Sequence, residues 1–151
     1  MHTRLPDMRA KSAAAGLRTW AQGAADQEAG VELLIRAFDG RFAQQGCPWV
    51  RPCGQRDIYC LDVHALVEQL GAFSTGERAV LSLVAALTDA RPIADLADLL
   101  ASLNRQHRQL VYAALEHVAG PHAELVRRGD ELVLVTPPAL VAWPTDRRRV
   151  A

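Results

Sequence analysis

The second half of the chain, residues 74–138, shows an order of patterns that restricts the folds open to it. Three amphipathic helical segments are followed by two short apolar runs around a glycine-containing turn. The first helix begins with Ser74-Thr75-Gly76-Glu77, a capping box in which serine and glutamate side chains accept each other's backbone N–H. Its apolar positions have the spacing of one helical face: Val80, Leu83, Val84 and Leu87.

Two further helices are expected between Pro92 and Gly120. Proline suits the first turn of a helix, so the second helix should run from Pro92 to about Ala101. Its inward side chains would be Ile93, Leu96 and Leu100. Ser102 could cap the third helix, whose expected inward face comprises Leu110, Val111, Ala114, Leu115 and Val118. We expect four of these leucine and valine side chains to be buried together: Leu96, Leu100, Val111 and Leu115.

The apolar runs 124–126 and 132–135 have the composition of strands, and Arg127-Arg128-Gly129-Asp130 between them is typical of a turn. Three helices followed by such a hairpin give residues 92–138 a resemblance to the winged helix-turn-helix superfamily. The resemblance rests on the helical run 93–100, on the recognition-type helix 102–115 and on the hairpin at 125–134. It implies that the third helix enters the major groove of DNA while the wing contacts phosphates.

The same resemblance implies a set of nucleic-acid-binding residues. On the third helix, exposed arginine, asparagine and glutamine are the side chains that pair with guanine and adenine edges. At the hairpin tip, the arginines stand where a wing meets phosphate. The implied residues are Asn104, Arg105, Arg108, Gln109, Tyr112, Arg127 and Arg128.

The first half of the chain predicts a helix, a hairpin and a short helix. A loose helix is expected near residues 8–22, and a clearer one, ending at Gly46, from the periodic residues Val31, Leu34, Ile35, Phe38 and Phe42. Residues 49–51 and 57–61 are expected strands around a turn at 52–55, and a short helix should precede Gly71.

We therefore expect a mainly α fold with small β-hairpins, in which a winged-helix-like C-terminal half packs on a helix–hairpin–helix N-terminal half. The expected divisions are an N-terminal segment at 1–73, the winged-helix-like module at 74–138 and a tail at 139–151. Within the tail, the short apolar segment 140–143 should pack back on the body.

The three cysteines lie within fourteen residues, and a histidine follows: Cys47, Cys53, Cys60 and His64. Three thiolates and one imidazole can complete a tetrahedral structural zinc site, and the spacing resembles that of CCCH zinc fingers. Equally, Cys60 can be a small core residue and His64 an exposed helical residue. We expect no required cofactor, with zinc at these four residues as the alternative. In that case Trp49 and Tyr59 could stack on unpaired bases of a single strand.

Charge bears on the choice of partner. The formal net charge is zero, which counts against a freestanding nucleic-acid binder, yet residues 101–151 carry seven basic and five acidic side chains. The leading expectation is a DNA-binding or transcription-associated protein, and the alternative is a protein–protein adaptor or assembly subunit using the same helices. A contiguous basic face would favour DNA, whereas an exposed apolar patch would favour a protein partner.

Catalytic and membrane signatures are not found in the sequence. It contains no nucleophile-elbow, zinc-protease or dinucleotide-loop motif, so we expect a non-catalytic protein. It contains neither an apolar run long enough to span a bilayer nor a signal peptide, and its odd number of cysteines fits poorly with a secreted disulfide framework. We expect a cytoplasmic protein without a membrane partner.

Overall fold

The computed structural model describes residues 12–121 and 123–145. Over these residues the chain is mainly helical with two small antiparallel strand pairs, as the sequence predicts. Residues 8–11 of the first expected helix and 146–151 of the expected tail lie outside the described residues. The elements are α1 (Ala13–Ala21), α2 (Ala25–Arg36), η1 (Ala37–Ala43), β1 (Val50–Pro52), β2 (Tyr59–Leu61), α3 (Val63–Gln69), η2 (Leu70–Ala72), α4 (Thr75–Asp89), α5 (Leu96–Ala101), α6 (Arg105–Ala119), β3 (Glu124–Arg128) and β4 (Glu131–Val135).

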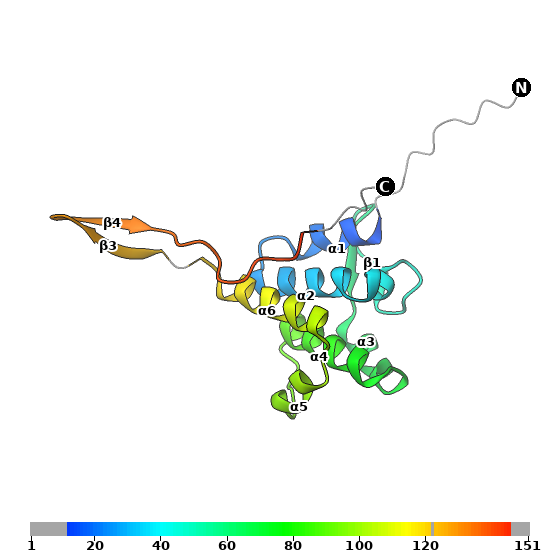
Figure 1. Cartoon of the computed structure of the whole chain (residues 1–151). Helices are drawn as coiled ribbons and strands as arrows, with labels where there is room; N and C mark the ends of the chain where they lie inside the picture. Colours follow the sequence, from blue (N-terminus) through cyan, green and yellow to red (C-terminus); the bar gives the residue numbers. More distant parts are fainter. Residues whose placement is uncertain (1–11, 122, 146–151) are drawn as a thin grey trace, which may run out of the picture.

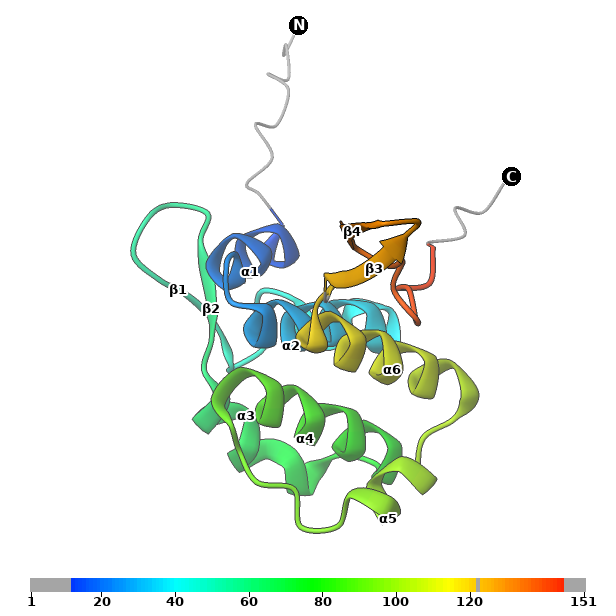
Figure 2. The same cartoon turned by 90° about the vertical axis from the view of Figure 1, so that its left-hand side faces the viewer.

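Helix α2 lies at the centre of the helical body (Figures 1 and 2). It packs most extensively on α4, and also on α6 and α1, while α1 additionally contacts β2. The buried apolar residues form one continuous cluster that extends from Leu17 on α1 to Ala114 on α6. One core therefore contains side chains from both sides of residue 74.

Two glycines mark the closest approaches between elements of this body. A Cβ on Gly30 of α2 would lie 2.4 Å from Cγ2 of Thr88 on α4, so the two helices pack with no room for a side chain there. A Cβ on Gly16 of α1 would lie 2.7 Å from the carbonyl oxygen of Asp57, just before β2. At these two positions a larger residue would force the neighbouring elements apart.

The expected helix from Val31 to Gly46 is wrong in its second half, because α2 ends at Arg36. Phe38, Asp39 and Gly40 all have positive φ, at 51°, 55° and 75°, and reverse the chain within η1. Asp and Gly both tolerate this left-handed conformation, so Asp39-Gly40 is a turn signal in the sequence. The helical spacing of Phe38 and Phe42 led to the wrong prediction that the helix continues.

After the reversal, the phenylalanines join an aromatic cluster. Phe42 meets Phe73 edge to face at 5.1 Å, and the ring of Phe38 lies 4.3 Å from that of His107. The indole Nε1 of Trp49 donates to the carbonyl oxygen of Phe42 at 2.7 Å. This cluster ties the segment before β1 to the start of α6.

The first hairpin and α3 are confirmed, but the bounds of the strands differ from the expected ones. Pro52 belongs to β1 and not to the turn, whereas Asp57, which has φ 65°, and Ile58 precede β2. β1 and β2 pair antiparallel with Val50 opposite Leu61, and α3 begins at an N-cap formed by the Asp62 carboxylate. The capping box at the start of α4 is also confirmed, since Ser74 Oγ accepts from the Glu77 amide while the Glu77 carboxylate accepts from the Ser74 amide.

The second helix of the C-terminal half is shorter than expected. Asp95 caps α5 by accepting from the Asp98 amide at 2.9 Å, so Pro92 and Ile93 precede the helix instead of forming its first turn. Ser102 does not cap α6 as expected. It ends α5, and Asn104 is the N-cap of α6. An aspartate carboxylate and an asparagine carbonyl are strong N-caps, so both helices begin at these side chains.

Helix α6 packs through a face slightly different from the expected one. Its buried residues are His107, Leu110, Val111, Ala113 and Ala114. The expectation that Leu96, Leu100, Val111 and Leu115 are buried together is wrong: Leu96 is 53% exposed, Leu115 is 47% exposed and Leu100 is half-buried. The reason is geometric, because α6 lies against α2 with the positions 107, 110, 111 and 114 inward, and Leu115 falls beside that stripe.

The second hairpin, β3–β4, projects from the body beyond the C-terminal end of α6 (Figure 1). The expected strands are confirmed, with Leu125 opposite Leu134 and Arg128 opposite Glu131. The turn is tighter than expected, since Arg127 and Arg128 belong to β3 and only Gly129 and Asp130 connect the strands. Within the described residues, no extensive contact joins this hairpin to a helix.

After β4 the chain returns to the body. The Leu140 amide donates to Glu116 Oε1 at 3.0 Å, and Arg36 Nη1 donates to the Pro144 carbonyl oxygen at 3.0 Å. Trp143 packs on the core as expected for this segment, whereas Leu140 stays exposed. Among the described helices, none combines the length and apolar character needed to cross a bilayer.

Candidate functional site

The nucleic-acid-binding residues expected on the third helix lie along the first half of α6. Arg105, Arg108, Gln109 and Tyr112 are exposed there. The Asn104 side chain is engaged in the helix cap, where Oδ1 accepts from the His107 amide at 2.8 Å. Four of the five helix residues are therefore free of the core and accessible to a ligand.

The two remaining residues, Arg127 and Arg128, are exposed at the end of β3. Helix α6 has 15 residues, which at 1.5 Å each separates its two ends by about 22 Å. The hairpin continues away from its C-terminal end (Figure 1). The structure thus places the helix arginines and the hairpin arginines at opposite ends of the C-terminal half, and it does not bring them together into one basic face.

The cysteines are three free, half-buried thiols. Burial and a hydrogen bond with the Cys53 side chain raise the pKa of Cys60 to about 11, which favours the protonated thiol. Cys47 Sγ donates to the Arg41 carbonyl oxygen, and exposed His64 lies beside Glu68 on α3. Among the described residues, no three His, Cys, Asp or Glu side chains are grouped to hold a metal ion. Zinc at these residues stays a prediction that the zinc content of purified protein tests.

A group of exposed apolar side chains forms one face of the β3–β4 hairpin, which we call the leucine face. Successive strand residues point to opposite faces and cross-strand partners share a face, so the register puts Leu125, Leu132 and Leu134 together with Arg127. These leucines are 67%, 63% and 67% exposed. Val126, Val133 and Val135 form the opposite face and are less exposed.

Exposed apolar side chains continue onto the body near the base of the hairpin. Tyr112, Leu115 and Val118 project from α6 at intervals of three residues, and Leu140 follows β4. Sequence reasoning assigned two of these α6 residues to the core. The signal that could have corrected it is the width of the apolar stripe, because a helix packed on one neighbour cannot bury 110, 111, 114, 115 and 118 together.

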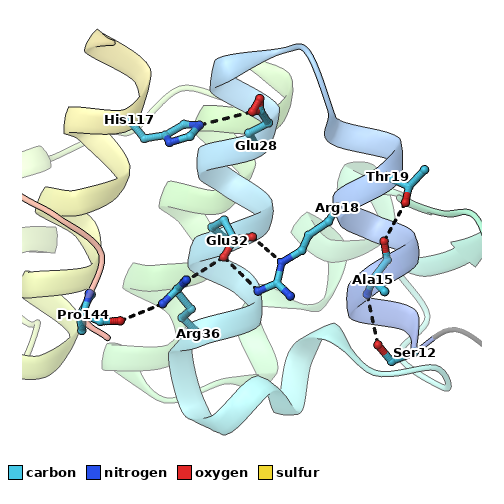
Figure 3. A network of polar contacts seen from close by, with 9 residues as sticks. All are labelled: Ser12, Ala15, Arg18, Thr19, Glu28, Glu32, Arg36, His117 and Pro144. Carbon is cyan, nitrogen blue, oxygen red and sulfur yellow. Dashed lines mark hydrogen bonds and ion pairs between the residues drawn. The ribbon is translucent and has the colours of Figure 1, made fainter. Parts of the chain in front are cut away.

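A second candidate site lies on α2 between α1 and α6, where the Glu32 carboxylate pairs with two arginines (Figure 3). Arg18 Nε lies 2.5 Å and Arg36 Nε 2.9 Å from the Glu32 carboxylate. Burial alone would raise the pKa of Glu32, but the hydrogen bonds and charges of the two arginines outweigh it and lower that pKa. The carboxylate is thereby held ionised and neutralised, unlike a general acid or base.

Beside this ion cluster is a small open cleft of about 190 Å³, lined by residues of α1, α2 and α6. His117 Nε2 lies 3.5 Å from Glu28 Oε2 on its wall (Figure 3). The lining offers no thiol or hydroxyl nucleophile: it comprises Arg18, Ala21, Gln22, Glu28, Val31, Glu32 and His117. The sequence signal for this cluster is the Glu32–Arg36 pair at i, i+4, whereas Arg18 arrives from another helix.

No family model, curated protein or solved structure matches this chain. The function therefore has to be argued from the surfaces described above.

Proposed function

We propose that this protein is a non-catalytic adaptor or assembly subunit that binds another protein through the leucine face of its β3–β4 hairpin. The observation that carries the proposal is the exposure of Leu125, Leu132 and Leu134 on an element that stands away from the body. Exposed apolar side chains gathered on one surface mark interaction sites, whereas scattered ones do not.

The stability of an isolated hairpin supports the same proposal. A two-stranded hairpin is marginally stable in water unless its apolar face packs against something. In the described chain the leucine face of β3–β4 has no such cover. A protein that covered the leucines would supply the missing packing, and exposed Val118 and Leu140 at the base would extend the contact.

DNA binding through a winged-helix-like module is the second candidate. The exposed Arg105, Arg108 and Gln109 at the start of α6 favour it, since this part of a recognition helix reads bases. In that arrangement the hairpin would serve as the wing. It ranks second because the hairpin arginines lie far from the helix arginines, and the net charge is zero.

Site-specific cross-linking in native extract tests the first candidate. A photo-reactive amino acid replaces Leu132, and a control protein carries it at exposed Gln55, between β1 and β2. We expect a discrete adduct with another protein from position 132 only, lost when Leu134→Ser is introduced in the same chain. No such adduct from position 132 would refute the adaptor function.

Retention on random duplex DNA tests the second candidate. At about 50 mM salt a protein that contacts several phosphates is retained, because it releases condensed counterions. The adaptor proposal predicts no retention. Retention that is abolished by replacing Arg105 and Arg108 with alanine, but not by Leu134→Ser, would instead favour DNA binding.

A further inference from the structure

We propose that β3 pairs with β3 of a second copy of this chain, antiparallel and centred on Val126, to form a four-stranded sheet with one continuous leucine face. The inference rests on the proposed function, since it names the occupant of one edge of the same hairpin. It goes beyond the proposed function by assigning the edge of β3 to self-association, while the leucine face binds the other protein.

Strand β3 has an unpaired edge among the described residues. Within the described chain each strand of the hairpin pairs on one side only, so β3 presents a free edge. Natural edge strands are protected by proline, by a bulge, by a covering element or by charged side chains that repel a second strand. Strand β3, Glu124-Leu125-Val126-Arg127-Arg128, pairs with β4 in unbroken register and contains no proline. Its charged side chains are the protection that is present, so the edge accepts another strand only in a register that pairs these charges.

The order of charges along β3 favours one register. A two-fold axis through Val126 places Glu124 opposite Arg128 of the second copy, and it does so twice. Opposite charges directly across an antiparallel pair are stabilising and like charges are destabilising. A register shifted by two residues toward the turn would instead set Arg127 against Arg127 of the second copy. The shift by two in the other direction leaves neither arginine facing a glutamate.

The backbone N–H and C=O groups of β3 point alternately toward β4 and toward the unpaired edge. Gly129 has φ 64° and Asp130 has no positive φ, the pattern of a two-residue hairpin turn with glycine at its first position. In such a hairpin Arg128 and Glu131 form the hydrogen-bonded closing pair, and the pairs alternate from there. The outward backbone groups of β3 then belong to Leu125 and Arg127. Centring on Val126 places Leu125 of one copy opposite Arg127 of the other. The N–H and C=O groups that point away from β4 in both copies can then hydrogen-bond each other.

The same parity excludes a register shifted by one residue. That shift would set outward groups of one strand against inward groups of the other, and it would place leucine faces on opposite sides of the sheet. Pairing β4 with β4 of the second copy brings no charge complementarity, because Glu131 would face Val135. Pairing β3 with β4 would repeat without closing, whereas a two-fold contact is closed.

The paired sheet also resolves the marginal stability of the hairpin. Three or more strands with a hydrophobic face are needed for a sheet to be stable by itself, and two copies supply four. The two-fold axis is perpendicular to the sheet, so Leu125, Leu132 and Leu134 of both copies lie on one face. That face is then a wider platform for the protein partner than one hairpin offers.

Charge reversal tests the pairing. Glu124→Arg and Arg128→Glu should each weaken dimerisation about tenfold or more, because each change turns two attractions into repulsions. Mixing the two variants restores both ion pairs, so the mixture should form a heterodimer that is tighter than the dimer of either variant alone. It should stay somewhat weaker than the native dimer, because Arg128→Glu also places a carboxylate opposite Glu131 of its own hairpin. Light scattering after size exclusion and sedimentation velocity measure both results.

Arg127→Glu is the matched control. It makes the same change of charge one residue away, on the leucine face, where the side chain lies opposite Leu125 of the second copy. Both Glu124–Arg128 pairs stay intact, so this variant should dimerise about as tightly as the native chain. The pairing is overturned if the native chain is monomeric at about 100 μM, a concentration at which even weak specific dimers are detectable. It is also overturned if the native dimer survives Glu124→Arg or Arg128→Glu, or if the mixture of these two variants fails to associate.

The two proposals fail in different ways. A monomeric native chain that still gives the Leu132 adduct with another protein would end the self-pairing and leave the adaptor function standing. A dimer that responds to the reversals as expected, but gives no adduct with another protein, would end the adaptor function alone.

Discussion

Leu33 on α2 and Leu132 on β4 have the same side chain and opposite surroundings: Leu33 is fully buried, whereas Leu132 is 63% exposed. In the helical body, the apolar side chains of α2 are buried between α1, α4 and α6. The hairpin has an equally regular apolar pattern, but within the described residues no helix packs extensively on it. The same kind of apolar pattern therefore produces a buried face in one region and an exposed face in the other, and under the proposed function a second protein covers the exposed face.

The largest effect should come from shortening the two leucines themselves. Leu33→Ala should lower the free energy of unfolding by about 2–5 kcal/mol, because it leaves a cavity in a closed core. Leu132→Ala in the monomer should change it by less than about 0.5 kcal/mol, as for other exposed sites. Urea denaturation at low protein concentration measures both. Equal losses of unfolding free energy in the two variants would show that Leu132 is buried against the body in solution, and the two leucines would then not differ in their surroundings.

Closing the contact between α2 and α4 should have the next largest effect. Gly30→Ala should cost about 1–3 kcal/mol through the clash with the Thr88 methyl, less whatever alanine gains in helix propensity. Thr88→Ser removes that methyl and keeps the hydroxyl that donates to the Val84 carbonyl oxygen, so it should relieve the clash in the double variant.

Gly71→Ala is the control for this change, because an added Cβ there meets nothing within 4 Å. Thermal unfolding of the four proteins measures the effects. If Gly30→Ala were as mild as Gly71→Ala, the body would be less tightly packed than its buried surface indicates.

The ion cluster should contribute a smaller, pH-dependent effect. Glu32→Gln should lower the free energy of unfolding at pH 7 by about 1 kcal/mol, because partial exposure of Arg18 screens the ion pairs to the scale of an ordinary hydrogen bond. The folded pKa of Glu32 is lowered, so its stabilisation is complete above the unfolded value of about 4.3 and is lost as pH falls through the folded pKa. The difference between native and variant should therefore narrow below about pH 4.

Glu68→Gln is the matched control, since that side chain is 63% exposed and should change little at either pH. A native–variant difference for Glu32→Gln that stays constant from pH 7 to about pH 3 would contradict the ion-pair account.

The smallest effect concerns the return of the chain after the hairpin. The Arg36 guanidinium lies 5.2 Å from the Trp143 ring centroid and donates to the Pro144 carbonyl oxygen. Arg36→Lys keeps the charge but loses the planar stacking, and should cost about 0.5 kcal/mol. Tryptophan fluorescence should report loosening of the segment around Trp143. An unchanged spectrum would mean that this segment does not belong to the body.

Local signals in the sequence predicted the elements better than their packing. The capping box at Ser74, the glycine turn at Gly129 and the turn residues between β1 and β2 depend on neighbouring residues, so they could be inferred directly. The end of α2 also has a local signal, the Asp39-Gly40 pair, but the helical spacing of Phe38 and Phe42 pointed to a longer helix. Apolar spacing predicts which side chains are buried, and the same side chains can be buried by a chain that reverses direction.

The candidate site could be predicted only in part. The sequence identified the hairpin and the arginines of β3, and it named an exposed apolar patch as the mark of a protein partner. The position of the hairpin relative to the body could not be predicted from the sequence, because it depends on the direction in which the chain leaves α6 at Gly120 and not on the strands themselves. The Glu32 cluster was likewise hidden, since Arg18 and Pro144 reach it from distant parts of the chain.

The bond between the Leu140 amide and Glu116 has a consequence for the whole projecting segment. It closes the base of the hairpin, so the chain departs from α6 and rejoins the body at nearly the same place. Residues 121–139 are in this sense an insertion between two fixed points of the helical body. Lengthening, shortening or exchanging them changes loop closure by only a fraction of a kcal/mol to about 1 kcal/mol. The reach of the hairpin can therefore vary from one chain to another while the scaffold that carries it stays the same.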